Sequence, residues 1–319
     1  RANYGFIDNF YIRGFQAEFL RDSIPDQITP VNTERSGLFR GFADVERIEV
    51  LKGPAGALYG VGASGDNVGA GLINLITYPF TTDSVFKVSL FGGSFERFGG
   101  TVNLSGALDP QVLYRLDGGY ESREGFRKLN LERLEILPSI QMKLDPNNTV
   151  TLDVDYRNIK ARPDIPSIPF LPGVNGRIIS GARDRLYFTP FSKADQEIYR
   201  LGLKYDLQAS PDLLLTNNIY YTNRKFDLIR NATDVIPYNV TPSAQFPSGV
   251  AIARRLREQT DNSEGIFYRL DGKLKARFLG IDHQILAGFE FNRIEGDTIR
   301  YQVGNIGNAT QSNNPTNLA

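Results

Sequence analysis

The chain has 319 residues, of which 41% are hydrophobic and 23% are charged, which is enough for one large ordered domain or two smaller ones. Its 36 basic and 36 acidic residues cancel and form no basic run, so the composition argues against a nucleic-acid-binding protein. The absence of cysteine excludes disulfides, thiolate metal sites and a cysteine nucleophile.

The first 80 residues are rich in glycine and carry short apolar runs separated by turns, without long regular alternation. Residues 45–51 predict a strand, which Gly53 and Pro54 end, and residues 55–59 can form one turn of helix. Residues 72–77 predict another buried strand. We therefore expect a separate domain over residues 1–80.

From about residue 84 onward the side chains alternate between apolar and polar, which is the period of a half-buried strand. Near residue 270, for example, Ile266, Tyr268 and Leu270 share one face, while Arg269 and Asp271 lie on the other. The alternation predicts nine strands in a second domain over residues 81–319. These strands are expected at residues 86–90, 101–108, 112–121, 133–144, 149–158, 197–208, 212–227, 265–277 and 283–295.

The connections between these strands are of two kinds. Longer segments follow the odd-numbered strands, and tight turns follow the even-numbered ones, at Asp109-Pro110-Gln111, Asp145-Pro146-Asn147-Asn148, Ser210-Pro211-Asp212 and Gly280-Ile281-Asp282. A soluble sandwich has no reason to gather its tight turns at one end, whereas outer-membrane barrels combine short periplasmic turns with long external loops. No run reaches the ~18–20 apolar residues that a membrane helix needs. The predicted fold class is therefore all-β, with a transmembrane antiparallel β-barrel.

A barrel of this kind cannot close with nine strands that end in an external loop. Each unpaired backbone group in hydrocarbon costs several kcal/mol, so an open sheet with two bare edges is not stable in a bilayer. We therefore expect the sequence to be a piece of a longer barrel; the alternative is that it does not form a membrane barrel.

Three segments of the first domain resemble a known family. They are Tyr11-Ile12-Arg13-Gly14-Phe15, residues 45–60 and residues 71–77, and in their order and spacing they are similar to the plug domain of TonB-dependent outer-membrane receptors. Residues 278–283 and 286–288 are similar to a hairpin of the ferric-siderophore receptors of the hydroxamate (ferrichrome) type. The resemblance implies a barrel of about 22 strands when complete, of which the first nine are present here, filled by an N-terminal plug.

The resemblance also implies a function. The expected protein is a receptor and active transporter in the outer membrane of a Gram-negative-type bacterium, which binds a ferric siderophore as its transported ligand and needs no cofactor. Its implied partners are the TonB energy-coupling protein, outer-membrane lipid and lipopolysaccharide, and the receptor is expected to be a monomer that binds no nucleic acid. The segment that contacts TonB in the family is not found in this sequence, and Arg21-Asp22-Ser23 stands where Arg-Asp-Gly is more usual.

Ligand-contacting residues are implied on plug tips and external loops, because a large polar chelate has to be caught at the outer face. They are Phe19, Phe39 and Arg40 in the plug, Phe170 in the third external loop and Tyr238 in the fourth. The alternative for each aromatic residue is packing within its own loop.

Two plug arginines, Arg13 and Arg47, are implied to pair with barrel glutamates and to lock the plug in the barrel. The alternative for them is an ordinary buried ion pair.

Nothing in the sequence favours an enzyme. The one histidine, His283, lies beside a tight turn without clustered carboxylates, so no metal site is expected. Residues 53–60 lack the Gly-Lys-Ser/Thr ending of a phosphate-binding loop. Asp153 and Asp155 share a strand face, as expected of a wet barrel interior. The alternatives to a siderophore receptor are a passive porin-like barrel, a TonB-dependent receptor for haem or cobalamin, and a barrel enzyme.

Overall fold

The computed structural model describes residues 10–26, 41–53, 71–163, 191–231, 237–239, 241, 250–252, 256–302 and 316–317. Within these residues, the regular elements are β-strands apart from one short 3-10 helix, η1 (Phe126–Lys128). Among the same residues no helix has the length and apolar character needed to span a membrane. The predicted all-β class is confirmed.

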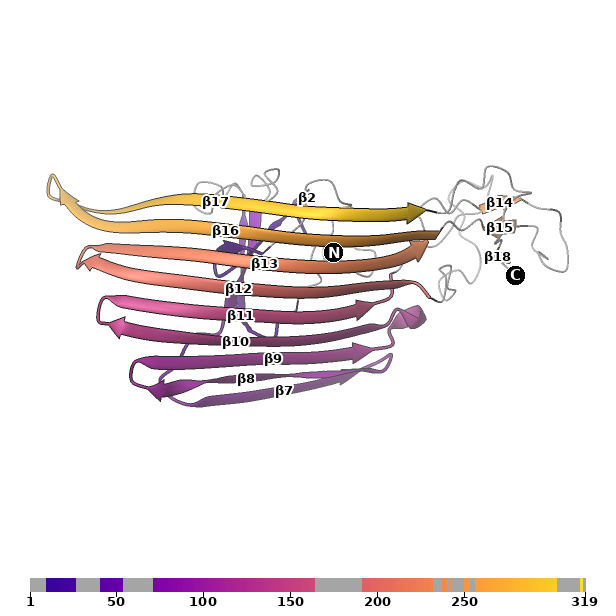
Figure 1. The fold of residues 1–319 in the computed structure, drawn as a ribbon, viewed down its shortest axis with the longest axis horizontal. Helices are drawn as coiled ribbons and strands as arrows, with labels where there is room; N and C mark the ends of the chain where they lie inside the picture. The colour runs from indigo at the N-terminus through magenta and orange to yellow at the C-terminus, as the bar shows by residue number, and fades with distance from the viewer. Residues whose placement is uncertain are drawn as a thin grey trace.

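Nine antiparallel strands form one large curved sheet, which we call the wall (Figure 1). Each strand pairs with the neighbours that precede and follow it in this sheet, as predicted. Several strands are longer than predicted, because a stretch such as residues 256–264 is polar on both faces and shows no apolar alternation. The strands are β7 (Val85–Gly93), β8 (Arg97–Asp109), β9 (Val112–Arg123), β10 (Leu131–Asp145), β11 (Asn148–Ala161), β12 (Lys193–Ser210), β13 (Leu213–Asn231), β16 (Leu256–Phe278) and β17 (Ile281–Gln302).

The predicted tight turns lie together at one end of the wall, at the left in Figure 1. In the turn between β8 and β9, Asp109 accepts hydrogen bonds from the backbone N–H groups of Gln111 at 2.7 Å and Val112 at 2.9 Å. Asp145 plays the same part between β10 and β11, where it accepts hydrogen bonds from the backbone N–H of Asn147 at 2.8 Å and from Asn148 Nδ2 at 2.9 and 2.7 Å. These local hydrogen bonds fix the turns and hence the strand register.

Pro138 lies inside β10, where a proline removes a hydrogen-bond donor from the ladder. On the β9 side its register partner is Leu116. On the β11 side the pairing passes from Ile136 directly to Ser139 and leaves Pro138 out. The missing donor thus falls at a local break in one ladder.

The two faces of the wall have opposite character. On the outer face large apolar side chains are exposed, for example Phe86 (70%), Leu90 (84%) and Leu201 (49%). On the inner face, which the N-terminal part of the chain contacts, charged side chains such as Asp117 and Arg157 are buried. An apolar outer face and a polar inner face are typical of a barrel wall in a membrane, and this fold is confirmed.

Smaller sheets precede the wall. β1 (Tyr11–Ile12) pairs with β2 (Phe15–Gln16), and a four-stranded sheet has the order β4-β3-β6-β5. Its members are β3 (Glu18–Arg21), β4 (Ile24–Pro25), β5 (Val45–Lys52) and β6 (Gly71–Thr77), which confirms the predicted strands at residues 45–51 and 72–77. We call it the small sheet. The proposed division at residue 80 falls between β6 and β7, and the predicted helical turn at residues 55–59 lies outside the described residues.

A three-stranded sheet joins β14 (Pro237–Asn239), β15 (Val250–Ile252) and β18 (Thr316–Asn317). It lies beyond the end of the wall that carries the long connections (Figure 1). We call this end of the wall the outer end, since long loops are external in barrels of this kind.

Candidate functional site

The buried guanidinium of Arg21 forms ion pairs with two aspartates next to the small sheet. Arg21 ends β3 and is 5% exposed. It forms an ion pair with Asp44 and a longer one, at 3.9 Å, with Asp26. Asp26 and Asp44 flank residues 27–43, so Arg21 clasps both ends of that segment.

The opposite charges of Arg21 and Asp44 each stabilise the ionised form of the other. Burial lowers the pKa of Arg21, but the neighbouring charges of Asp44, Asp26 and Asp155 outweigh it and raise the pKa well above its ordinary value. Burial raises the pKa of Asp44, and the charges of Arg21 and Arg157 outweigh that and hold it below its ordinary value. Both groups are therefore charged at neutral pH.

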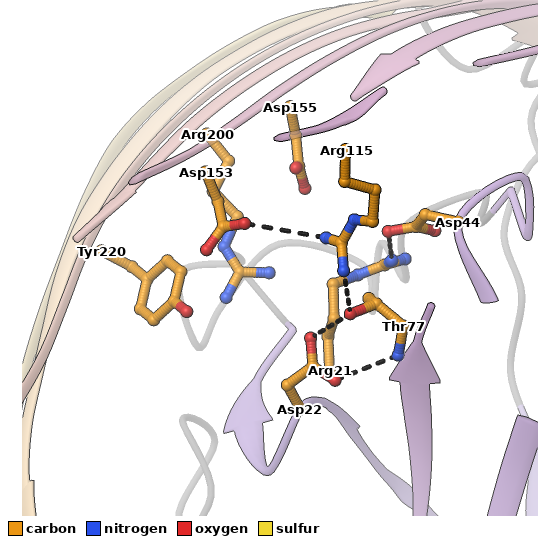
Figure 2. Close-up of a pocket in the computed structure, with 9 residues that line it drawn as sticks. All are labelled: Arg21, Asp22, Asp44, Thr77, Arg115, Asp153, Asp155, Arg200 and Tyr220. Carbon is orange, nitrogen blue, oxygen red and sulfur yellow. Dashed lines mark hydrogen bonds and ion pairs between the residues drawn. The ribbon is translucent and has the colours of Figure 1, made fainter. Parts of the chain in front are cut away.

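Two wall arginines contact the N-terminal segments around Arg21, Asp26 and Asp44, the group that we call the clasp. Figure 2 draws both arginines, Arg115 and Arg200, with Arg21 and Asp44. Arg200 of β12 contacts Asp26 at 3.3 Å and lies over the ring of Tyr220, 4.2 Å from its centroid. Arg115 of β9 donates to Thr77 Oγ1 at 3.0 Å and to the backbone carbonyl of Tyr78. Charge-assisted hydrogen bonds thus join segments that are 174 positions apart for Asp26 and Arg200, and 38 positions apart for Thr77 and Arg115.

Close backbone packing accompanies these charges. A Cβ atom on Gly41 would lie 1.8 Å from the carboxylate of Glu135 on β10, so this position admits only glycine unless Glu135 moves. Beside it, Asn103 of β8 donates to the carbonyl oxygen of Ala43 at 2.7 Å. Further along the wall, Arg269 of β16 donates to the carbonyl oxygen of Ser23 at 3.0 Å. The small sheet is therefore held by strands from β8 to β16.

The cavity within this interface is small. Its volume is about 20 Å³, room for only one or two water molecules. Its lining combines acids, arginines and two hydroxyl groups, and comprises Arg21, Asp22, Asp44, Thr77, Arg115, Asp153, Asp155, Arg200 and Tyr220. A molecule much larger than water does not fit here, so this cavity belongs to the contact between the small sheet and the wall.

The predicted ligand contacts are not brought together among the described residues. Phe19 is 3% exposed in β3, and its ring centroid lies 4.9 Å from that of Phe10, so in this conformation it packs inside the small sheet. Tyr238 belongs to β14, opposite Ala251. Phe39, Arg40 and Phe170 lie outside the described residues. A role in ligand binding stays a prediction for all five.

The predicted locking arginines are exposed. Arg13 lies in the turn between β1 and β2, in the left-handed region with φ 53°. Arg47 on β5 pairs with its strand neighbours Glu46 at 3.0 Å and Glu49 at 3.1 Å. Their pairing with barrel glutamates also stays a prediction.

The sequence did not single out Arg21, Asp26, Asp44, Arg115 or Arg200. One signal was available, because charged residues at every second position of a strand indicate a polar inner face, and Arg115 and Arg200 occupy such positions. The sequence carries no signal for which residue of the N-terminal segments each of them contacts. Within the described part of the chain, no cluster of histidine and acidic side chains could hold a metal ion.

Comparison with known proteins now places this architecture. Residues 1–65 match the family model described as the TonB-dependent receptor plug domain. Over these residues the chain is similar to a TonB-dependent receptor plug. The matched residues include β1 to β5, and the resemblance to the TonB-dependent receptors is confirmed.

Relatives extend the match beyond the plug. The metal-pseudopaline receptor CntO of Pseudomonas aeruginosa (strain UCBPP-PA14) is 26% identical over 263 residues, which are 81% of this chain and 34% of that protein. The ferrichrome outer membrane transporter/phage receptor of Escherichia coli K12 is 22% identical over 93% of this chain and 39% of its own length. Resemblance to the ferrichrome type is consistent with these relatives, which do not single it out.

The fold is shared with solved receptor structures. The ferric-catecholate import receptor Fiu of E. coli K12, in its open form, superposes with a TM-score of 0.77 at 20% identity over 92% of this chain and 45% of that one. This chain spans less than half the length of each of these three proteins. These matches are to transport receptors, which favours a protein without enzymatic activity.

Proposed function

We propose that this chain serves in an outer-membrane receptor that binds a ferric siderophore and imports it with energy from the TonB system. One observation supports this above the others: a plug is fixed by buried charges to the polar inner face of a wall whose outer face is apolar. A receptor that moves a bulky chelate against a gradient needs such a stopper, which stays closed until work is done on it.

A passive porin is the chief alternative of another class. Diffusion requires an open lumen, whereas here the plug backbone approaches the wall so closely that Gly41 leaves no room for a Cβ atom. Breaking a buried ion pair on one side costs about 3–5 kcal/mol, so thermal motion alone seldom opens such an interface. The plug therefore favours an energy-coupled transporter over a porin.

The proposed ligand contacts are Phe39, Arg40, Phe170 and Tyr238. Phe19 would join them only if the plug rearranges and frees it from Phe10. Arg13 and Arg47 are exposed in the described structure, which suits a role in pairing with acids elsewhere in the receptor. Proposed surroundings are outer-membrane lipid and lipopolysaccharide, and the proposed energy-coupling partner is TonB.

The experiment uses the full-length receptor in a strain without its own iron-chelate receptors. Uptake of radioactive iron is measured from a panel of ferric siderophores, with haem and cobalamin as competing ligands, in cells with and without TonB. We expect TonB-dependent uptake of at least one ferric siderophore. Uptake of cobalamin or haem alone would replace the siderophore by another ligand.

A second variant separates the receptor from the porin. Deletion of residues 1–80 should abolish TonB-dependent uptake and admit small solutes of the kind that diffuse through porins. Coupled uptake that survives this deletion unchanged contradicts the proposal.

A further inference from the structure

The inner face of the wall carries an excess of positive charge on β12, β13, β16 and β17, between the plug contacts and the outer end. The strand register places alternate residues of each strand on this face. On the outer-end side of Arg200, its described charged side chains are four arginines and one aspartate, namely Arg224, Arg230, Arg257, Arg300 and Asp261. We call this group the arginine patch.

Arg224 is the centre of the patch. It is 1% exposed, and its guanidinium lies 4.7 Å from the ring centroid of Phe226 on the same strand face. Among the described residues, Nε and Nη2 of Arg224 find no hydrogen-bond acceptor. A buried guanidinium with unused donors is rare, because each such donor forfeits its hydrogen bonds to water.

Asp261 is close enough for its charge to act on Arg224, but it accepts no hydrogen bond from Nε or Nη2 of Arg224. Both oxygens of Asp261 accept hydrogen bonds from Gln259 Nε2, at 3.0 and 2.8 Å. The residue directly opposite Arg224 on β16 is Ser263, and its buried hydroxyl is also without a hydrogen-bond partner in the described part of the chain. The unused donors of Arg224 and Ser263 thus lie at neighbouring positions of two adjacent strands on the inner face.

We propose that Arg224 and Ser263 bind a negatively charged oxygen of the transported chelate, so that the receptor takes an anionic ferric chelate. The inference rests on the proposed import function and narrows its substrate class. A planar guanidinium donates two parallel hydrogen bonds to a carboxylate or to the paired oxygens of a catecholate. A ferric trihydroxamate is neutral and offers no such charge.

The position suits a ligand that arrives from outside. Arg224 lies nearer the outer end than Arg200, which contacts Asp26, and is followed on the same face by the apolar pair Phe226 and Leu228. Because Arg224 is only 1% exposed in this conformation, a ligand reaches it only in a conformation in which Arg224 is more exposed. In a site of low dielectric constant, the anion then gains more from the guanidinium than it would at the surface.

The test uses Arg224→Gln, Arg224→Lys and Ser263→Ala in the full-length receptor. The matched control is Arg277→Gln, which removes an arginine that is 74% exposed at the opposite end of β16, about 45 Å away along the strand. The probes are an anionic ferric tris-catecholate, ferric citrate and the neutral trihydroxamate ferrichrome. Binding to purified receptor and uptake by cells are both measured.

We expect Arg224→Gln to weaken binding of an anionic chelate by at least about tenfold, and Ser263→Ala to weaken it less, with ferrichrome and the Arg277→Gln control unaffected. Arg224→Lys keeps the charge and should lose less than Arg224→Gln, which also keeps the test valid if the glutamine variant is poorly folded. The inference is overturned if Arg224→Gln weakens the binding of neutral and anionic chelates equally. It is also overturned if the wild-type receptor binds ferrichrome but neither anionic chelate. Both outcomes leave the proposed import function intact. Failure of the wild-type receptor to bind or import any ferric chelate overturns the import function itself.

Discussion

The inner face of the wall has two halves, β8–β11 and β12–β17, which differ in how their charged side chains are paired. On β8–β11, three arginines and three acids alternate in one continuous ladder, Arg97–Glu121–Arg133–Glu135–Arg157–Asp155, with N–O distances from 2.8 to 3.6 Å. On β12–β17, arginines outnumber acids, and Arg224 keeps two donors without a hydrogen bond. In the ladder, Arg157 Nε also makes no hydrogen bond, but it lies 3.6 Å from Glu135 in an ion pair. Both halves are polar, but the ladder on the first half has equal numbers of positive and negative side chains, which pair with one another.

This difference separates a structural surface from one available to a ligand. Every cation of the ladder has an anion beside it, so the ladder has no charge left for a ligand and instead supports the plug at Gly41. A cation that lacks its counter-charge within the protein is destabilising by itself and gains most from an anion that arrives. The contrast predicts opposite responses to mutation in the two halves.

The largest effect is expected from the middle of the ladder. Glu135→Gln keeps the shape but leaves Arg133 and Arg157 facing each other without the acid between them. Breaking such a buried network should lower the free energy of unfolding by about 3–5 kcal/mol. Denaturant unfolding of the full-length receptor in detergent measures this, and a loss below about 1 kcal/mol would mean that the ladder is not a stabilising unit.

A smaller effect is expected where the plug meets the ladder. Gly41→Ala places a Cβ atom against the Glu135 carboxylate, which can withdraw only by weakening its ion pairs, at a cost of about 1–3 kcal/mol. In the Glu135→Ala background the same glycine substitution should cost much less, because the two changes share one contact. Equal costs in both backgrounds would show that Gly41 is required for another reason.

The clasp at Asp44 should respond to acid and not to base. Its folded-state pKa lies below the ordinary value, so its contribution to stability is complete above that value and is lost as the pH falls through the folded pKa. Limited proteolysis of the plug compares wild type with Asp44→Asn across the pH range. The difference between them should be constant from about pH 8 to pH 5 and shrink below about pH 4. A difference that already shrinks near neutral pH would contradict this assignment.

The wall could be predicted from signals between residues close in sequence. The contacts between the small sheet and the wall could not, because they join residues far apart in sequence. Period-two alternation and turn residues such as Asp109 and Asp145 act within a few positions, so they are visible in one sequence. The pair of Asp26 and Arg200 is separated by 174 positions, and nothing local reports it. Phe19 was predicted as a ligand contact from the family resemblance alone, and that role stays a prediction. Its strand has only four residues, too few for alternation to reveal that the side chain is buried.

The smallest effect on stability is expected at the centre of the arginine patch. Arg224→Met removes a buried charge that has unused donors and replaces it with an apolar side chain of similar length, so the free energy of unfolding should stay unchanged or rise by up to about 1–2 kcal/mol. The matched substitution on the other half, Arg157→Met, breaks two ion pairs and should lower it by about 3–5 kcal/mol. The sign of the difference decides the comparison, because a comparable loss for both variants would mean that Arg224 is already satisfied within the protein and has nothing to offer an anion.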